Sequence, residues 1–391
     1  MVRGVGVLCV IGAHSVGPYV SRPLPGLLWP IYEPAAGLWE ADPAHGPAPG
    51  ITDLVFWIIR AFTVPMFFFV AGLMGHQALE RHGAREFIRS RARKVGSALF
   101  AGFFLVMPVV YVIWVWGWVR YGYAAWEHLR HFHFGPAVQQ NLHGFGHLWY
   151  LWYLLLMCAA AAGVWRVFEQ RKNKNSGSAA FTFGSALLAA CVLVPLGTLS
   201  ETAVRVFENG YVPRAGFFLF HAVFFAWGMA SSRGLLRRDS AARVLWVRLA
   251  PITSMTGFVC AVWMLVVLHP ALHIRQNEPP PVELSSTDQW RVGVLAAVSG
   301  VMLVMGVVGT CLSGRGGRLS GRLAGLGRAS MWVYITHMPW VGLAAVAMFG
   351  LRMPGELKAG IAFFFALAMA LVTRRMFART RVGAWLGASA L

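Results

Sequence analysis

Two ionisable residues, Arg3 and His14, lie within the otherwise apolar residues 1–19. Eleven residues at about 100° each make just over three turns of helix, so both side chains point the same way. At about 1.5 Å per residue the two positions stand roughly 16 Å apart, one near a membrane surface and one near the middle of the bilayer. Ionisable groups at that depth usually face a protein interior or a water-filled cavity. A neutral imidazole placed there can accept a proton from a hydroxyl as a general base.

A signal peptide with a stray histidine is the competing interpretation of this segment. No small-residue cleavage site follows it, and hydrophobic segments recur to the end of the chain. Both observations favour a membrane-spanning helix.

Three further polar residues fall within apolar stretches. Arg60 lies about two turns into the second stretch, where a cavity role and snorkelling to the surface both stay open. His337, close to Pro339, fits a site residue as well as a hydrogen-bonded packing residue. His221 is more typical of a satisfied packing residue.

No metal centre is expected. Residues 127–133 read Glu-His-Leu-Arg-His-Phe-His, but this spacing matches no strict metal-binding pattern. The five cysteines lie inside or at the edge of apolar runs and form no CxxC pair, so neither a disulfide framework nor a zinc site is indicated. No glycine-rich phosphate loop opens a helix.

The composition is that of a membrane protein. Of 391 residues, 57% are apolar and 13% are charged, and the mean hydropathy is +0.59; soluble domains carry about 25% charged residues. We expect an all-α polytopic integral membrane protein with about ten transmembrane helices in a single domain, residues 1–391. The expected spans cover residues 4–20, 53–77, 96–118, 147–165, 180–199, 214–231, 249–270, 291–312, 329–348 and 359–374.

The distribution of charge predicts the orientation. With both termini in the cytoplasm, 24 of the 34 Lys and Arg residues fall in inner segments and nine in outer ones, while Arg60 lies inside the second span. Eleven of the 15 acidic residues fall outside. The net charge of +19 is therefore a positive-inside signature rather than a nucleic-acid footprint, and the expected surroundings are a lipid bilayer.

Several segments between the spans have a distinct composition. Residues 77–94, QALERHGAREFIRSRARK, form a basic amphipathic stretch with Leu79, Phe87 and Ile88 on its apolar side, so we expect it along the cytoplasmic surface. Pro65 predicts a kink or a broken helix in the second span. Three long outer segments are rich in proline, aromatic residues or histidine, at residues 20–52, 119–146 and 271–288.

Five short motifs, in order along the chain, resemble the acyltransferase 3 family of membrane acyltransferases. They are Arg3 followed by ten residues and His14, WPIYEP (29–34), VPMFFFVAG (64–72), HLWYLWYLL (147–155) and ASMWVYITHMPWV (329–341). The branch that they resemble most is the osmoregulated periplasmic glucan biosynthesis protein C type, which transfers succinyl groups to glucans. The resemblance implies that Arg3 and His14 are catalytic. It also implies a donor-binding set, Arg89, Arg91, Arg93 and Lys94, and a site-lining set, Glu33, Arg60, His147, Trp149 and His337.

The chain departs from the family pattern at a few positions. Ala71 replaces a usual Ser, Thr63 stands where a basic residue is expected, and Lys94 replaces the last Arg of an Arg-x-x-Arg pair. Lys keeps the charge but not bidentate phosphate recognition. Relatives usually carry a few polar residues before the first Arg, so a start upstream of Met1 stays open.

The expected activity is O-acyl transfer of an acetyl or succinyl group from a cytoplasmic acyl-CoA, a co-substrate rather than a cofactor, to a hydroxyl of an extracytoplasmic glycan or glucan. Cations at the inner surface would hold the donor phosphates, and His14 would deprotonate the acceptor directly, without an acyl-enzyme. The implied location is the bacterial cytoplasmic (inner) membrane. Aromatic residues of the outer segments fit sugar stacking or an interfacial belt, namely Trp29, Tyr32, Trp39 and Trp126.

A transporter or flippase for a glycan or a lipid-linked saccharide is the alternative, since ten spans and a polar cavity fit it equally well. No acidic residue lies deep within a span and no inverted repeat is visible, which favours the enzyme. The choice between His14 and His337 as the base stays open.

Overall fold

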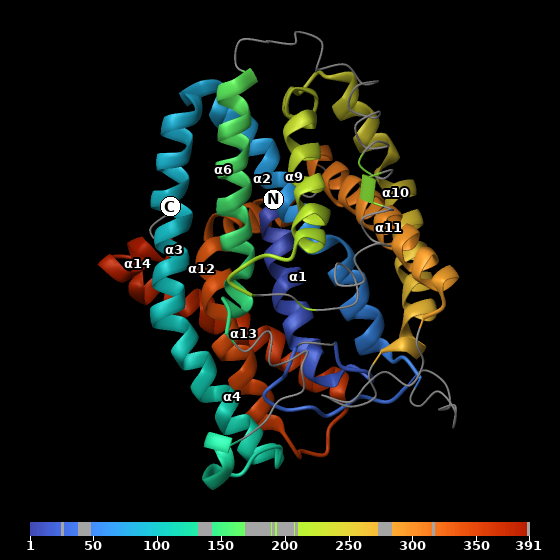
Figure 1. The fold of residues 1–391 in the computed structure, drawn as a ribbon, viewed down its shortest axis with the longest axis vertical. Coiled ribbons are helices and arrows are strands. Elements are labelled where there is room, and N and C mark those ends of the chain that lie inside the picture. Colours follow the sequence, from blue (N-terminus) through green and yellow to red (C-terminus); the bar gives the residue numbers. More distant parts are fainter. Residues whose placement is uncertain are drawn as a thin grey trace.

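The computed structural model is a bundle of helices (Figure 1). It describes residues 1–24, 27–37, 48–131, 143–168, 189, 192–193, 207, 210–272, 284–314 and 317–388. Within these ranges the helices are α1 (Val2–Val16), α2 (Ile51–Arg91), α3 (Ser97–Ala101), α4 (Met107–Tyr121), α6 (Trp149–Phe168), α9 (Ala215–Leu236), α10 (Ala241–Leu268), α11 (Ser286–Ser313), α12 (Gly317–Met348), α13 (Gly355–Phe377) and α14 (Arg381–Trp385).

Seven helical segments of the described ranges are long and apolar enough to cross a membrane, which confirms the all-α membrane fold. One of them, Ile51–Tyr121, contains both the second and the third expected spans. α1 has 15 residues and is about 22 Å long, shorter than the roughly 30 Å hydrocarbon core. The expected span at 180–199 lies outside the described residues except for 189, 192 and 193. The count of ten and the orientation therefore stay predictions.

Gly83 turns the chain within α2. Its φ of 70° and ψ of 170° are not helical, and a positive φ of this kind favours glycine. The chain runs up to this turn and returns through α3 and α4 (Figure 1). Of the kink or broken helix expected at Pro65, the break is corrected, because Pro65 lies inside α2 where the dihedrals stay helical, and the kink stays a prediction.

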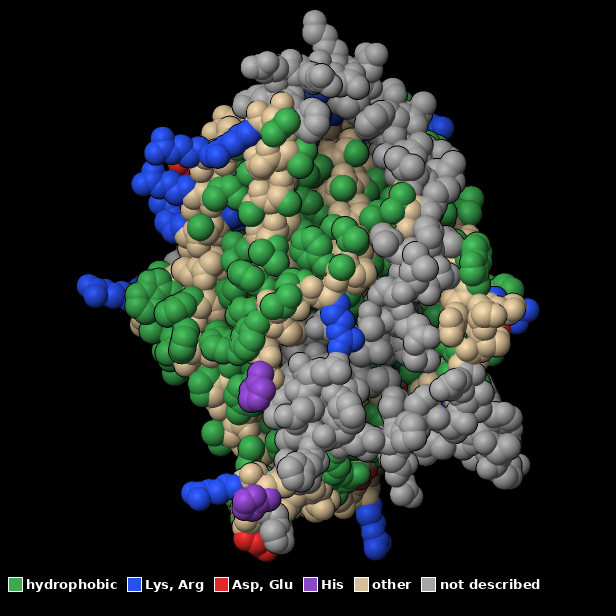
Figure 2. Space-filling view, viewed as in Figure 1, with side chains coloured by type: hydrophobic (Ala, Val, Ile, Leu, Met, Phe, Trp, Pro, Cys, Tyr) green, Lys and Arg blue, Asp and Glu red, His purple; other side chains and the backbone are tan. Residues whose placement is uncertain are grey.

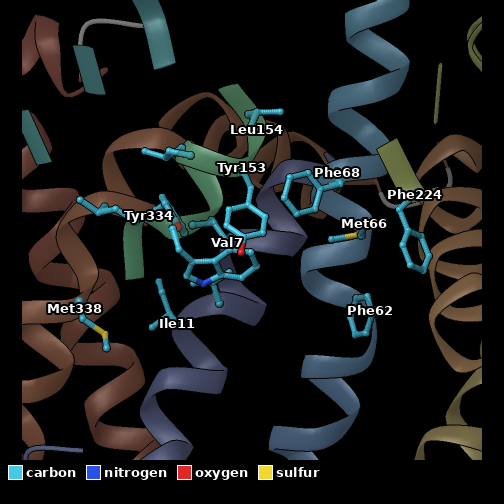
Figure 3. Close-up of a cluster of buried hydrophobic side chains, with 14 of the residues drawn as sticks. Val7, Ile11, Phe62, Met66, Phe68, Tyr153, Leu154, Phe224, Tyr334 and Met338 are labelled. Atoms are coloured by element: carbon cyan, nitrogen blue, oxygen red, sulfur yellow. The ribbon is translucent and has the colours of Figure 1, made fainter. Parts of the chain in front are cut away.

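α1 lies between α2 and α12 in the middle of the bundle (Figure 1). Val7 and Ile11 of α1 are fully buried, and Figure 3 shows them among side chains of α2 and α12. A Cβ on Gly4 of α1 would lie 2.1 Å from the carbonyl oxygen of Leu323 in α12. Small residues thus allow backbones to touch, as is usual between membrane helices.

The outer faces of several helices are apolar. Hydrophobic side chains cover the middle of the face shown in Figure 2, as expected where lipid is the solvent. Large exposed side chains include Phe100, Val112, Ile252, Met255 and Phe364.

Candidate functional site

A cavity opens beside α1 and is walled by residues of α1, α2, α6, α9, α10, α11 and α12. Its ionisable lining residues include three histidines and one arginine, namely His14, His147, His221 and Arg60. No Asp or Glu is among the described residues that line it. The wall is otherwise aromatic and aliphatic, so the polar groups are few and convergent, as in most small-molecule sites.

His14 and His337 form a hydrogen bond across the α1–α12 contact. His14 Nδ1 lies 2.8 Å from His337 Nε2, and His337 is fully buried. His337 Nδ1 faces two carbonyl oxygens, 2.7 Å from that of Tyr334 and 3.2 Å from that of Val333. Sequence reasoning treated the two histidines as rivals, whereas the structure makes them a pair.

The hydrogen-bond acceptors around the His14 and His337 rings indicate which ring nitrogens carry a proton. Carbonyl oxygens only accept, so His337 Nδ1 carries a proton and its Nε2 has the lone pair in the neutral ring. The proton between the rings therefore belongs to His14 Nδ1, which donates to His337 Nε2. His14 Nε2 is then left with a lone pair on a ring that lines the cavity.

His147 completes a cluster of three imidazoles. Its Nε2 donates to the carbonyl oxygen of Ile335 at 2.9 Å, and its own carbonyl accepts the Tyr334 hydroxyl. The His147 ring stands perpendicular to that of His337, with centroids 5.5 Å apart. His147 Nδ1 is buried and has no hydrogen-bond partner among the described residues, so it can accept a hydrogen bond from a ligand.

Trp29 covers His14 from the loop that follows α1. The two ring centroids are 6.1 Å apart, and Trp29 is buried. Trp118 Nε1 donates to the carbonyl oxygen of Trp29 at 3.0 Å and fixes the loop on α4. A Cβ on Gly17 would lie 2.0 Å from the Trp29 ring, so this roof requires glycine there.

The structure brings together some of the residues predicted for the site. His14, Arg60, His147 and Trp149 line the cavity. His337 is not in the wall but lies behind His14. Trp149 packs against Phe217 and His221, which are also in the wall.

Glu33 was predicted to line the site, but it is absent from the cavity wall. Its Oε1 binds Lys358 Nζ at 2.7 Å. The pairing satisfies a fully buried lysine of α13 and thereby engages the Glu33 carboxylate outside the wall.

The predicted donor-binding set also lies outside the cavity wall. Of this set, Arg89, Arg93 and Lys94 are exposed, whereas Arg91 is half-buried with its guanidinium 5.2 Å from the centre of the Phe87 ring. Arg3, predicted to be catalytic, is exposed and also lies outside the wall.

Sequence reasoning missed several wall residues. His221 was assigned to packing, yet it lines the cavity while its Nδ1 donates to the carbonyl oxygen of Phe217 at 2.9 Å. Tyr150 and Tyr334 lie inside motifs that had been singled out, one helical turn or less from His147 and His337, and that spacing could have indicated them. The described residues hold no group of three potential metal ligands. Trp39 and residues 132–142 of the segment rich in aromatic residues and histidine lie outside the described ranges.

Comparison with known proteins identifies the family. The family model described as an acyltransferase domain, acyltransferase 3, matches residues 1–374. Neither the curated proteins nor the solved structures contain a match. Because the family model spans nearly the whole chain of 391 residues, from the Arg3–His14 helix to α13, the chain belongs to the acyltransferase 3 family and is an integral membrane acyltransferase.

Proposed function

We propose that this enzyme moves an acetyl or succinyl group from a cytoplasmic acyl-CoA to a hydroxyl of an extracytoplasmic glycan, with His14 as the general base. The observation that carries the proposal is the proton arrangement of the histidine pair. His337 Nε2 accepts the hydrogen bond from His14 Nδ1, so the basic nitrogen of His14 is Nε2, on a ring that lines the cavity.

His337 is a poorer candidate for the base. It is fully buried, its Nε2 accepts from His14, and its Nδ1 donates to carbonyl oxygens. Neither ring nitrogen is left to meet a substrate. The geometry therefore favours His14 as the base and makes His337 the group that orients it.

The transfer balances with these residues alone. The acceptor oxygen attacks the thioester carbonyl carbon while His14 Nε2 takes the hydroxyl proton, and the carbonyl electron pair moves to its oxygen. Collapse of this tetrahedral species breaks the C–S bond, and the departing thiolate takes the proton from His14. The thiol product and the new ester leave the enzyme in its starting state.

Donor and acceptor approach from opposite ends in this proposal. Arg3 is exposed and Arg91 half-buried, and both would hold the phosphates of the donor by charge-assisted hydrogen bonds. The acceptor would approach from the Trp29 side, where aromatic rings suit a sugar face. The bacterial inner membrane and a glucan acceptor belong to the same proposal, by the resemblance to the glucan succinyltransferase branch.

His14→Gln tests the assignment, because glutamine keeps a hydrogen bond but cannot take the proton. Transfer of labelled acetyl from acetyl-CoA to a glycan should fall by about two to four orders of magnitude, while donor binding persists. His337→Gln should lose less, since its side-chain oxygen can still accept from His14 Nδ1. Near-normal transfer by His14→Gln together with loss of transfer by His337→Gln would place the base on α12.

A further inference from the structure

We infer that Trp57 and Arg60 of α2 form a binding site for an anionic oxygen of the acyl unit, within the cavity and level with His14. The inference rests on the proposed function, in that it names what the same cavity binds. It gives a role to two polar groups that the proton-transfer steps leave unused.

Trp57 supplies an unpaired donor. The side chain is 1% exposed, and it lines the cavity. Its Nε1 is buried and has no hydrogen-bond partner in the part of the chain that the structure describes. An indole N–H only donates, and a buried donor without a partner costs about 1–3 kcal/mol. A ligand acceptor would remove that cost.

Arg60 supplies the charge. It follows Trp57 by three residues on α2, and its Cζ lies 5.8 Å from the centre of the Trp57 ring. Both side chains line the cavity, and the described wall contains no carboxylate.

The pair lies at the depth of the proposed base. A Cβ on Gly12 of α1 would lie 3.2 Å from Ile59 Cδ1 of α2, which fixes the register of the two helices. His14 is two residues beyond Gly12, and Trp57 and Arg60 flank Ile59. A guanidinium and an N–H therefore face the same level of the cavity as His14.

An anionic oxygen can come from two sources in this reaction. The first is the carbonyl oxygen, which becomes negative when the hydroxyl attacks and the C=O pair shifts onto it. The second is a free carboxylate at the far end of a dicarboxylic acyl group. Preorganised donors in a dry site stabilise either charge strongly.

The test compares Arg60→Gln and Trp57→Phe with wild type, using acetyl-CoA and succinyl-CoA as donors. Trp246→Phe is the matched control, because Trp246 Nε1 is also buried without a partner among the described residues but does not line the cavity. If the oxyanion is the ligand, Arg60→Gln lowers kcat about 10²–10³-fold with both donors. Trp57→Phe then loses about tenfold, and Trp246→Phe keeps wild-type rates.

If the terminal carboxylate is the ligand, Arg60→Gln raises KM for succinyl-CoA alone by at least about tenfold. Wild-type rates in Arg60→Gln with both donors, in an active wild-type preparation, overturn the inference while leaving the proposed function intact. Titration with acetate and with its neutral isostere acetamide provides a readout independent of catalysis. Acetate should bind wild type at least about tenfold more tightly than Arg60→Gln, with acetamide equal in both; equal acetate binding also overturns the inference.

Discussion

The two ends of the bundle differ in whether their charged residues are buried and hydrogen-bonded or exposed. At the end that carries the loop after α1, charges are buried and paired: Asp53 accepts from the backbone of Ser21, and Arg22 Nη1 donates to the carbonyl oxygens of Pro270 and Leu272. Just after the turn at Gly83 within α2, Arg89, Arg93 and Lys94 are exposed. Figure 2 shows Lys and Arg side chains gathered at the upper left, where Figure 1 places this turn.

We call the loop end, with its buried polar groups, the roof, and the end with the exposed Arg89, Arg93 and Lys94 the rim. Buried polar groups fix a structure only when every partner is present, whereas an exposed arginine contributes little to stability and stays available to an incoming anion. Substitutions at the roof end should therefore change stability, and substitutions at the rim should change donor binding.

The largest loss of stability is expected from substitutions in the ion pair between Glu33 and Lys358. Lys358 is 1% exposed and Glu33 is 31% exposed, so the two partners are not equivalent. Glu33→Ala leaves a buried cation and should lower the free energy of unfolding by about 3 kcal/mol. Lys358→Met leaves a carboxylate on a side chain that is only partly buried and should cost roughly half as much.

Thermal unfolding in detergent measures both variants. The control is Glu86→Ala, an exposed acid near the rim, which should stay within about 0.5 kcal/mol of wild type. Equal losses for Glu33→Ala and Glu86→Ala would show that the buried pair does not hold the roof.

The rim contains one arginine that differs from its neighbours. Arg91 is half-buried, with its guanidinium 5.2 Å from the centre of the Phe87 ring, whereas Arg93 is exposed. Arg91→Ala should raise KM for acyl-CoA about tenfold, because a charge-assisted contact to phosphate is lost. Arg93→Ala and Lys94→Ala should each change it less than about twofold. Equal effects at all three positions in steady-state assays would mean that only surface charge matters.

The smallest effect is expected from probes of orientation. In a cysteine-free background, Glu86→Cys and Ala36→Cys place single thiols on exposed positions at the two ends. Neither change should alter transfer much. An impermeant reagent on intact cells should label position 36 and spare position 86, by the 24-to-9 charge asymmetry. Labelling of position 86 from outside would reverse the proposed orientation.

Sequence alone predicted the helices well where hydropathy marks them. The expected span 291–312 lies within α11, and 359–374 lies within α13. The expected span 329–348 covers only the apolar part of α12, which begins at Gly317 in a basic segment that hydropathy does not detect.

The shared direction of Arg3 and His14 was also predictable from helical spacing. Both face α12: a Cβ on Gly327 would lie 3.8 Å from Arg3 Cβ, and His14 binds His337. The partners themselves were not predictable, because spacing within one helix carries no information on which helix packs against it. The Glu33–Lys358 pair joins residues 325 positions apart, and no local pattern signals it.

The bond between His14 and His337 has a consequence for biogenesis. The two residues are 323 positions apart, so the first helix enters the membrane long before its partner is made. At about 5–20 residues per second, synthesis takes roughly 15–65 s to reach His337 after His14. During that interval the imidazole at the core of the future site lacks its native acceptor. Assembly of the last helices is therefore the event that creates the oriented histidine, and a nascent chain that stops before α12 carries an unsatisfied polar group for quality control to detect.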